Sequence, residues 1–241
     1  MAGTQTGKKT WKAVDVLREL RALADPRVRA KMSHFGVHVE KAHGISAPQL
    51  HRLAKQIGKN HELAEQLWAS GIHEAKILAA LIGEPEEVTV VQMERWARGF
   101  DSWDVVDGAC CYLFAYAAPA WEKAIAWSRR REEYVKRAGF SLMAYLAYKD
   151  KQAPNLRFVR LLRIIRRQAG DERNFVKKAV NWALRNIGKR NMQLNLAAIR
   201  AAEEIRENDS AAARWVAADA LWELKGPAVQ RRLRAAAEGK K

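Results

Sequence analysis

Apolar side chains recur at helical spacing along the chain, most clearly between Asp171 and Asn191. At 100° per residue, one half of a helix over this stretch is apolar and the other half is polar or basic. The apolar half consists of Phe175, Ala179, Val180, Ala183, Leu184 and Ile187. The polar half consists of Lys177, Lys178, Asn181 and Arg185. The pattern predicts an amphipathic helix with a basic outer face.

Trp182 falls on the border between these two halves. Lys178 lies one turn before it and Arg185 one turn after it, so two cations flank the indole on the same face. One interpretation is a tryptophan at a seam between two helices, with solvated lysines outside. The other is a basic, aromatic surface that meets a phosphate backbone. This stretch by itself leaves both open.

The same spacing predicts short helices, each of about a dozen residues, along most of the remaining chain. The first begins near Trp11, Asp25 with Pro26 starts the second, and Ser46 caps the third. Further helices are predicted at 60–69, 71–82, 88–99, 102–116, 118–127, 131–147, 155–168, 172–188, 190–205, 210–225 and 227–237. Glycines at the predicted ends are expected to be left-handed C-cap residues: Gly58, Gly71, Gly83, Gly170, Gly188 and Gly226.

Helices that follow one another across short connectors are typical of stacked antiparallel helix pairs. A pair recurs about every 35 to 40 residues, which is in the range of HEAT-like repeats. The prediction is an all-α protein, an α-solenoid of HEAT-like antiparallel helix pairs with a concave basic face. One repeat domain is expected over residues 11–237, between a disordered tail at 1–10 and a disordered basic end at 238–241.

The composition agrees with a folded helical chain and adds a strong charge. Hydrophobic residues make up 49% of the 241 residues, enough for a sizeable core, and only 6 prolines and 14 glycines interrupt it. The formal net charge is +16, far more than solubility requires, so a polyanion is the expected partner. A membrane surface is the competing polyanion, but no apolar run approaches the roughly 20 residues needed to span a bilayer. No signal-peptide pattern precedes the first helix either.

The cations of the later helices greatly outnumber the acids near them and could line a groove of nucleic-acid size. Some of them must instead solvate the outer face. They are Arg129, Arg130, Arg131, Lys136, Arg137, Arg157, Arg160, Arg163, Arg166, Arg167, Lys177, Lys178, Arg185, Lys189 and Arg190.

Metal, redox and nucleotide chemistry have little support in the sequence. Cys110 and Cys111 are neighbours that point about 100° apart on a helix, so they form neither a disulfide nor a metal clip, and a reducing cytoplasm fits best. His34 and His38 have helical metal spacing, but no carboxylate or cysteine completes a site. No phosphate-binding glycine loop, dinucleotide turn or nucleophile elbow occurs. We therefore expect no metal and no cofactor.

Asp107 is the best candidate for a reactive carboxylate. It lies one turn after Trp103, on the rim of an apolar arc of the helix predicted at 102–116. An aspartate that is partly desolvated against an indole is either locked in a structural ion pair or held for use. A buried salt bridge with Arg137, on the helix predicted at 131–147, is the obvious structural alternative.

Three segments resemble the AlkD-type DNA alkylation repair family of HEAT-like DNA glycosylases. They are SWDVVD at 102–107, KRAGF at 136–140 and FVKKAVNWALRNIGKRN at 175–191. The similarity extends from about residue 45 to residue 224 and is loose before Gly44. It implies a solenoid that holds duplex DNA on its concave basic face. It also implies the removal of positively charged alkylated purines, such as 3-methyladenine and 7-methylguanine.

The resemblance also implies roles for single residues. Trp103 and Trp182 take the places of the two active-site tryptophans, and Asp107 takes that of the catalytic carboxylate. Arg137 takes the place of an arginine near the DNA backbone, and Arg185 that of a phosphate-contacting arginine. Lys178 and Arg190 complete the set of predicted DNA-binding residues.

The chain departs from the family pattern at Ser102, where the best-known members carry a second aromatic residue. Its amino-terminal connector, HFGVHVEKAHG, also differs. Two other functional classes therefore stay open beside a monomeric glycosylase acting on double-stranded DNA. One is a non-catalytic nucleic-acid-binding scaffold or lesion sensor. The other is an adaptor whose basic face binds acidic proteins.

Overall fold

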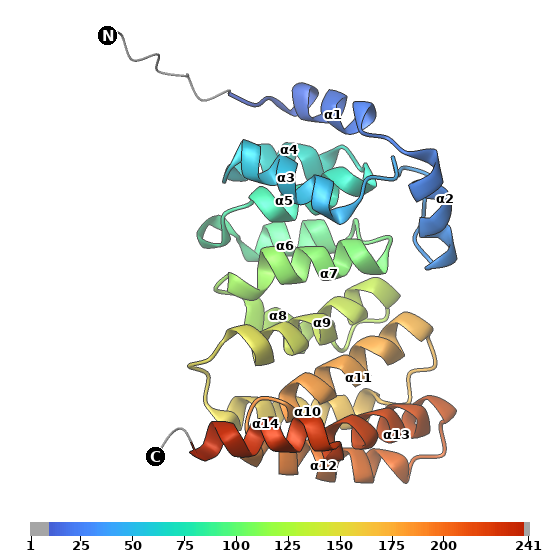
Figure 1. Ribbon diagram of the computed structural model, residues 1–241, viewed down its shortest axis with the longest axis vertical. Helices are drawn as coiled ribbons and strands as arrows, with labels where there is room; N and C mark the ends of the chain where they lie inside the picture. The colour runs from blue at the N-terminus through green and yellow to red at the C-terminus, as the bar shows by residue number, and fades with distance from the viewer. Residues whose placement is uncertain (1–9, 239–241) are drawn as a thin grey trace. The chain divides into compact units, whose positions relative to one another are not determined.

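The computed structural model describes residues 10–238, which fold into helices joined by short connectors (Figure 1). No strand occurs among these residues, so the all-α prediction is confirmed. In the same range no helix is long and apolar enough to cross a membrane. Of the predicted tail at 1–10, only Thr10 is described, and it is exposed and not helical. Glu238 was expected to begin a disordered end but is the last residue of a helix, and 239–241 lie outside the described residues.

The described chain divides between Glu87 and Val88 into two compact units. The expectation of one repeat domain over 11–237 stays a prediction. Unit 1 contains α1 (Ala13–Ala22), α2 (Pro26–His34), α3 (Ala47–Ile57), α4 (His61–Ala69), α5 (His73–Ile82) and the 3-10 helix η1 (Pro85–Glu87). The predicted starts are confirmed, because Asp25 caps α2 with Pro26 at its first turn and Ser46 forms a capping box with Gln49.

A buried carboxylate fixes the connector between α2 and α3. Glu74, in the first turn of α5, is fully buried, and its Oε1 accepts hydrogen bonds from the backbone nitrogens of Gly44 at 2.7 Å and Ile45 at 3.2 Å. Gly44 has a φ of 81°, and a Cβ at this position would lie 2.3 Å from the carbonyl oxygen of Asp25. The connector, whose sequence pattern is loose, is therefore ordered by a contact from outside itself.

Unit 2 contains the remaining helices of the described chain. They are α6 (Val90–Ala97), α7 (Trp103–Tyr112), the 3-10 helix η2 (Phe114–Tyr116), α8 (Ala120–Trp127), α9 (Glu133–Lys149), α10 (Asn155–Gln168), α11 (Asn174–Gly188), α12 (Met192–Arg206), α13 (Ala211–Lys225) and α14 (Pro227–Glu238). The helices α7, α9, α11 and α13 pack in succession and form one layer. The helices α10 and α12 pack on each other, and they contact α11 and α13 from the other layer. This alternation is the arrangement expected for stacked helix pairs.

Two of the six predicted left-handed glycine caps are confirmed. Gly58 and Gly71 have φ values of 80° and 70°. The prediction is wrong for four others, which do not have a positive φ: Gly83, Gly170, Gly188 and Gly226. Gly226 precedes Pro227 and is extended, as a residue before proline prefers to be. Gly188 is buried at the end of α11, where a Cβ would lie 2.7 Å from the side chain of Leu224, so packing rather than backbone conformation requires glycine.

The first part of unit 2 is held by an aromatic core and by one carboxylate beside it. Trp127, which is fully buried, packs against Phe114 at a ring distance of 6.1 Å. Its Nε1 donates a hydrogen bond of 2.9 Å to Glu94 of α6, which also accepts one of 2.8 Å from the buried Nζ of Lys123. Burial raises the pKa of Glu94, but the hydrogen bonds and charges of its partners outweigh burial, so the pKa is lowered. Glu94 thus compensates a buried ammonium group.

Replacing this carboxylate should destabilise unit 2. We expect Glu94→Gln to lower the free energy of unfolding by about 2 to 3 kcal/mol, because Lys123 would stay buried with only the exposed Glu122, 3.9 Å away, as a counter-charge. Urea unfolding followed by circular dichroism measures the change. Glu203→Gln is the matched control, since Glu203 pairs with Lys225 at an exposed position and its loss should change the midpoint little. Equal midpoints for both variants would contradict the assignment.

Candidate functional site

Helix α7 places Trp103 and Asp107 one turn apart on one side. Ser102 is its N-cap residue and is fully buried, and its hydroxyl is hydrogen-bonded to the carboxylate of Asp104. Asp104 in turn accepts a 3.0 Å hydrogen bond from the backbone nitrogen of Val105, which fixes the first turn. Ser102, where the chain departs from the family pattern, is thus a buried N-cap residue.

A stripe along α9 meets Asp107. Arg137 and Ser141 lie four residues apart and both point at its carboxylate. Oδ1 accepts hydrogen bonds from Arg137 Nε at 3.1 Å and Ser141 Oγ at 2.8 Å, and Oδ2 accepts one from Arg137 Nη2 at 2.6 Å. The carboxylate is thus held in one orientation by three hydrogen bonds, and its side chain is still 18% exposed.

Arg137 is an internal residue of the site. Its side chain is 8% exposed, its Nη1 donates a 2.8 Å hydrogen bond to the carbonyl oxygen of Phe175 on α11, and its guanidinium carbon lies 5.8 Å from the centre of the Trp103 ring. The alternative interpretation, a buried salt bridge between Arg137 and Asp107, is therefore confirmed. In this position Arg137 binds the Asp107 carboxylate and the α11 backbone. Its proposed place near a DNA backbone stays a prediction.

Tyr145 connects this part of the site to Trp182. It follows Ser141 by four residues on the same stripe of α9, and its ring packs edge-on against Trp182 of α11 at a centroid distance of 4.8 Å. Burial and the negative charge of Asp107 both raise the pKa of Tyr145, because each disfavours the phenolate. The α9 stripe thus brings Asp107 on α7 and Trp182 on α11 to one region of unit 2.

Burial and hydrogen bonding have opposite effects on the pKa of Asp107. Burial raises its pKa above the ordinary value of 3.8, and it outweighs the opposite effects of Arg137 and Ser141. Because one oxygen accepts two hydrogen bonds and the other accepts one, Oδ2 keeps a free lone pair. The group can orient a water molecule or face a cation from this side.

The other predicted DNA-binding cations differ in how far they are already engaged. Lys178 is exposed, and within the described residues it has no ion pair. Arg185 is paired with Glu223 of α13 at 2.5 Å and with Asp219 at 3.4 Å. Arg190 donates hydrogen bonds to three backbone carbonyls around the end of α9 and the start of α10, at 147, 151 and 153. Lys178 is therefore the one of these three that is free for a phosphate group.

Burial lowers the pKa of Arg190, and Asp150 only partly opposes this. Its guanidinium also lies 4.5 Å from the ring of Phe158. These contacts make it a structural cation that closes the connector between α9 and α10. A DNA contact by Arg190 or Arg185 stays a prediction.

The sequence analysis did not identify Tyr145 or the two acids of α13, Asp219 and Glu223. A signal for Tyr145 was present, because Arg137, Ser141 and Tyr145 are spaced by four residues and must share one face of a helix. No comparable signal marks the acids, since their partners lie on another helix.

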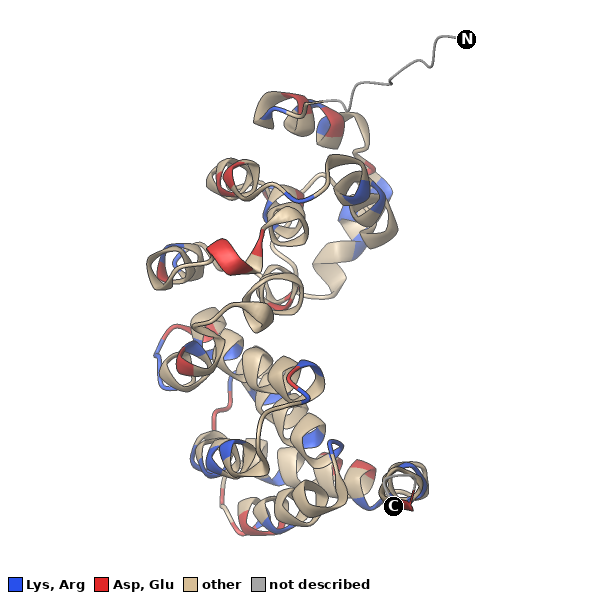
Figure 2. Ribbon diagram, turned by 90° about the vertical axis from the view of Figure 1, so that its left-hand side faces the viewer, with Lys and Arg blue, Asp and Glu red and all other residues tan. Residues whose placement is uncertain are grey.

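Lys and Arg residues occur in both layers of unit 2, as the blue ribbon segments in Figure 2 show. The expected single concave groove along the whole chain stays a prediction. Among the residues that the structure describes, no group of three or more His, Cys, Asp or Glu side chains could hold a metal ion. The candidate site itself consists of the Asp107 carboxylate, the indoles of Trp103 and Trp182, and the cations around them.

Comparison with known proteins gives a family match and a similar fold. The family described as DNA alkylation repair enzyme matches residues 16–224. A solved structure described as "a new family of proteins related to the HEAT-like repeat DNA glycosylases with affinity for branched DNA structures" has a TM-score of 0.73. It is 22% identical and aligns over 86% of this chain and 92% of that chain, which confirms the predicted HEAT-like helical repeat. No curated protein matches the chain.

The family match includes all of α7, α9 and α11, and with them the three segments on which the resemblance rests. It also covers far more than half of the sequence. The chain belongs to the DNA alkylation repair enzyme family.

Proposed function

We propose that this protein binds duplex DNA and hydrolyses the N-glycosidic bond of cationic alkylpurines of the 3-methyladenine and 7-methylguanine type. The observation that carries the proposal is the Asp107 carboxylate, which three hydrogen bonds hold beside Trp103. A charge fixed before the reaction stabilises a transition state without reorganisation during it.

The chemistry needs little more than such a charge. Alkylation at a ring nitrogen makes the purine a cation, so its glycosidic bond is already weak and no strong general acid is required on the leaving base. As the C–N bond breaks, positive charge develops on the deoxyribose. Asp107 would stabilise this charge, and its free Oδ2 lone pair would orient the water molecule whose oxygen forms the new bond to the sugar. The electrons of the broken bond leave with the base, which becomes neutral. The water molecule that adds to the sugar loses one proton to the solvent, which leaves a hydroxyl group on the sugar.

The two tryptophans would hold the cationic groups. An indole face attracts a cation with about 0.5 to 2 kcal/mol. Trp182 is partly exposed and is supported from one side by Tyr145, which leaves the remainder of its ring for a ligand. Lys178, on the same side of α11, would contact the phosphate backbone next to it.

A second candidate function, a non-catalytic DNA-binding scaffold or lesion sensor, has a specific observation in its favour. The guanidinium of Arg137 lies directly on the Asp107 carboxylate and cancels part of the field that catalysis would use. The matched solved structure is described by its affinity for branched DNA structures, which is consistent with a binding role in a related fold. The scaffold would use Trp182 and Lys178 but would not need the charge of Asp107.

Excision of 7-methylguanine from a duplex separates these two functions. We expect Asp107→Asn to reduce the rate of base release by about 100-fold or more, the usual effect of removing one preorganised electrostatic group. Affinity for the same duplex should persist, because Asp107 makes no phosphate contact in this scheme. Free base and alkali-labile sites are the measurements.

Asp104→Asn is the matched control, because Asp104 is a second carboxylate on α7 that faces Ser102 instead of Arg137. It should retain excision. Circular dichroism of both variants checks that loss of the buried ion pair has not unfolded the protein. Release at the same rate from wild type and Asp107→Asn would remove Asp107 from its role. No release from wild type, with intact binding, would favour the scaffold.

The rate of excision should fall at acidic pH. The fall should begin at a higher pH than it would if Asp107 had the ordinary pKa of an aspartate. Burial raises the pKa of Asp107, and the protonated group carries no charge to stabilise the sugar cation, so activity falls as the pH drops through this raised value. Ser141→Ala removes a hydrogen bond that favours the ionised form and should move the acidic limb to still higher pH. Rates under single-turnover conditions test this. An unshifted limb in Ser141→Ala would contradict it.

Lys178 and Arg190 should behave in opposite ways. Lys178→Ala should reduce the slope of log affinity against log salt by about 0.9, the value of one phosphate contact on duplex DNA. Arg190→Ala should leave the slope unchanged but lower the unfolding midpoint, because three backbone carbonyls lose their donor. Binding titrations across a salt series and urea unfolding give both quantities. A reduced slope in Arg190→Ala would instead place that arginine on the DNA.

A further inference from the structure

Helix α10 carries a stripe of arginines that the site on α7, α9 and α11 does not use. All of them are exposed, and α10 contains no acidic residue. They are Arg157, Arg160, Arg163, Arg166 and Arg167. Arg160, Arg163 and Arg167 lie within about 60° of one another around the helix and span about 10 Å at 1.5 Å per residue. This length corresponds to about three nucleotide steps of a DNA strand at 3.4 Å each.

The stripe lies on the side of α10 that faces away from the other layer. Phe158, Leu161 and Ile165 are fully buried on the opposite side of the helix, where α10 packs on α11 and α12. Lys178 lies on the exposed side of α11, in the layer of α7, α9 and α13, and the nearby Trp182 packs on Tyr145 of α9. A DNA segment that contacts Lys178 would therefore leave the α10 arginines free for another ligand.

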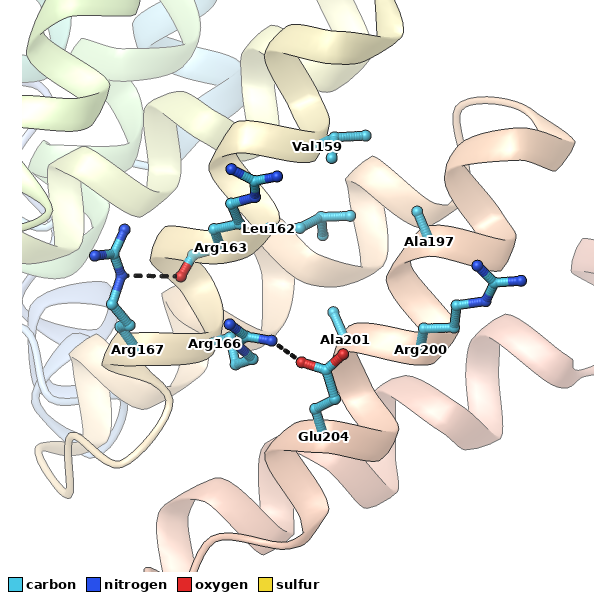
Figure 3. Close-up of a pocket in the computed structure, with 9 residues that line it drawn as sticks. All are labelled: Val159, Leu162, Arg163, Arg166, Arg167, Ala197, Arg200, Ala201 and Glu204. Carbon is cyan, nitrogen blue, oxygen red and sulfur yellow. Dashed lines mark hydrogen bonds and ion pairs between the residues drawn. The ribbon is translucent and has the colours of Figure 1, made fainter.

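A hollow of about 680 Å³ lies between α10 and α12, and arginines surround it (Figure 3). Arg163, Arg166 and Arg167 come from α10 and Arg200 from α12, and Glu204 is the single acid in the lining. Glu204 pairs with Arg166. Within the described chain the guanidinium groups of Arg163 and Arg200 have no hydrogen-bond partner, and Figure 3 shows them extended on either side of the hollow.

An anion bound here would relieve the repulsion between these cations. Arg163 and Arg167 are four residues apart, and like charges at this spacing destabilise a helix slightly. The lining also includes Val159 and Ala197, whose side chains carry no charge. A guanidinium group matches two oxygens of a phosphate through parallel hydrogen bonds, which makes arginine the preferred side chain for this ligand.

We propose that this surface, the α10–α12 hollow with the α10 arginine stripe, binds the phosphate backbone of a second DNA segment while α11 holds the first. The choice of DNA as the occupant rests on the proposed function. Recognition would be independent of base sequence, because the stripe offers only guanidinium groups to the ligand. The protein would thus bridge two duplex segments, on opposite layers of unit 2.

The test is the stoichiometry and salt dependence of binding to a short unmodified duplex, measured by sedimentation and by titration. Wild type should bind two duplexes. Arg163→Ala/Arg167→Ala should weaken the second step at least tenfold and reduce its salt slope by about 1.8, for two lost phosphate contacts. The first step and base excision should not change, which also shows that the variant is folded.

Three further variants sharpen the result. Arg231→Ala/Arg234→Ala removes two exposed arginines from α14 and is the matched control, which should keep both steps. Arg200→Ala tests the hollow from α12 and should weaken only the second step. Glu204→Gln removes the single acid and frees Arg166, so the second step should become tighter.

The possible failures are distinguishable. A wild type that binds one duplex, with a slope unaffected by Arg163→Ala/Arg167→Ala, would overturn the second site and leave the proposed function intact. A wild type that binds no duplex would overturn the proposed function itself. If Arg231→Ala/Arg234→Ala weakened the second binding step as much as Arg163→Ala/Arg167→Ala, the effect would come from net charge and not from the α10 surface. Polyglutamate could also displace duplex from the wild type and fail to bind Arg163→Ala/Arg167→Ala. That result would indicate that the hollow binds an acidic protein instead of DNA.

Discussion

One buried ion pair holds the candidate site together. The guanidinium of Arg137, on α9, binds the Asp107 carboxylate of α7 with two hydrogen bonds and the Phe175 carbonyl of α11 with a third. The same group lies against the ring of Trp103. Three helices are therefore fixed relative to one another by a single side chain. Loss of one partner would leave the other charge buried, a cost of about 3 to 5 kcal/mol.

This ion pair limits the function as well as supporting it. A carboxylate next to a guanidinium acts on its surroundings as a dipole, whose field falls faster with distance than that of a free charge. Asp107 can therefore stabilise a cation only at short range, on the side of Oδ2 that keeps a free lone pair. Whether the protein cuts or only binds depends on how closely a sugar can approach this oxygen. Burial strengthens every interaction there, which partly offsets the cancellation by Arg137.

Local chemistry explains how much of the fold and site the sequence could predict. Helix positions follow from apolar spacing and from caps such as Ser46. The ion pair between Asp107 and Arg137 could be predicted as the structural interpretation of Asp107, because both residues lie beside apolar helix faces. Contacts between distant helices were not predictable. Asn181 belongs to the polar half of its helix but is only 2% exposed, because Asp219 of α13 accepts its hydrogen bond. The sequence alone suggests that Arg190 is a surface cation. In the structure, its guanidinium group donates hydrogen bonds to backbone carbonyls at the end of α9 and in the α9–α10 connector. Hydrophobic periodicity shows which side of a helix is apolar, but not which neighbour covers the remainder.

The same limit applies to charge. A net charge of +16 predicts a polyanionic partner but does not locate it, because each cation must first be matched against the acceptors of the fold. Arg137, Arg185 and Arg190 give their donors to carboxylates and carbonyls of unit 2, whereas Lys178 and Arg163 do not. In a two-layer stack each helix has one unpacked side, and the layers turn these sides in different directions. Lys178 of α11 and the arginines of α10 belong to helices of different layers, and in our proposal the surplus charge of unit 2 serves two surfaces.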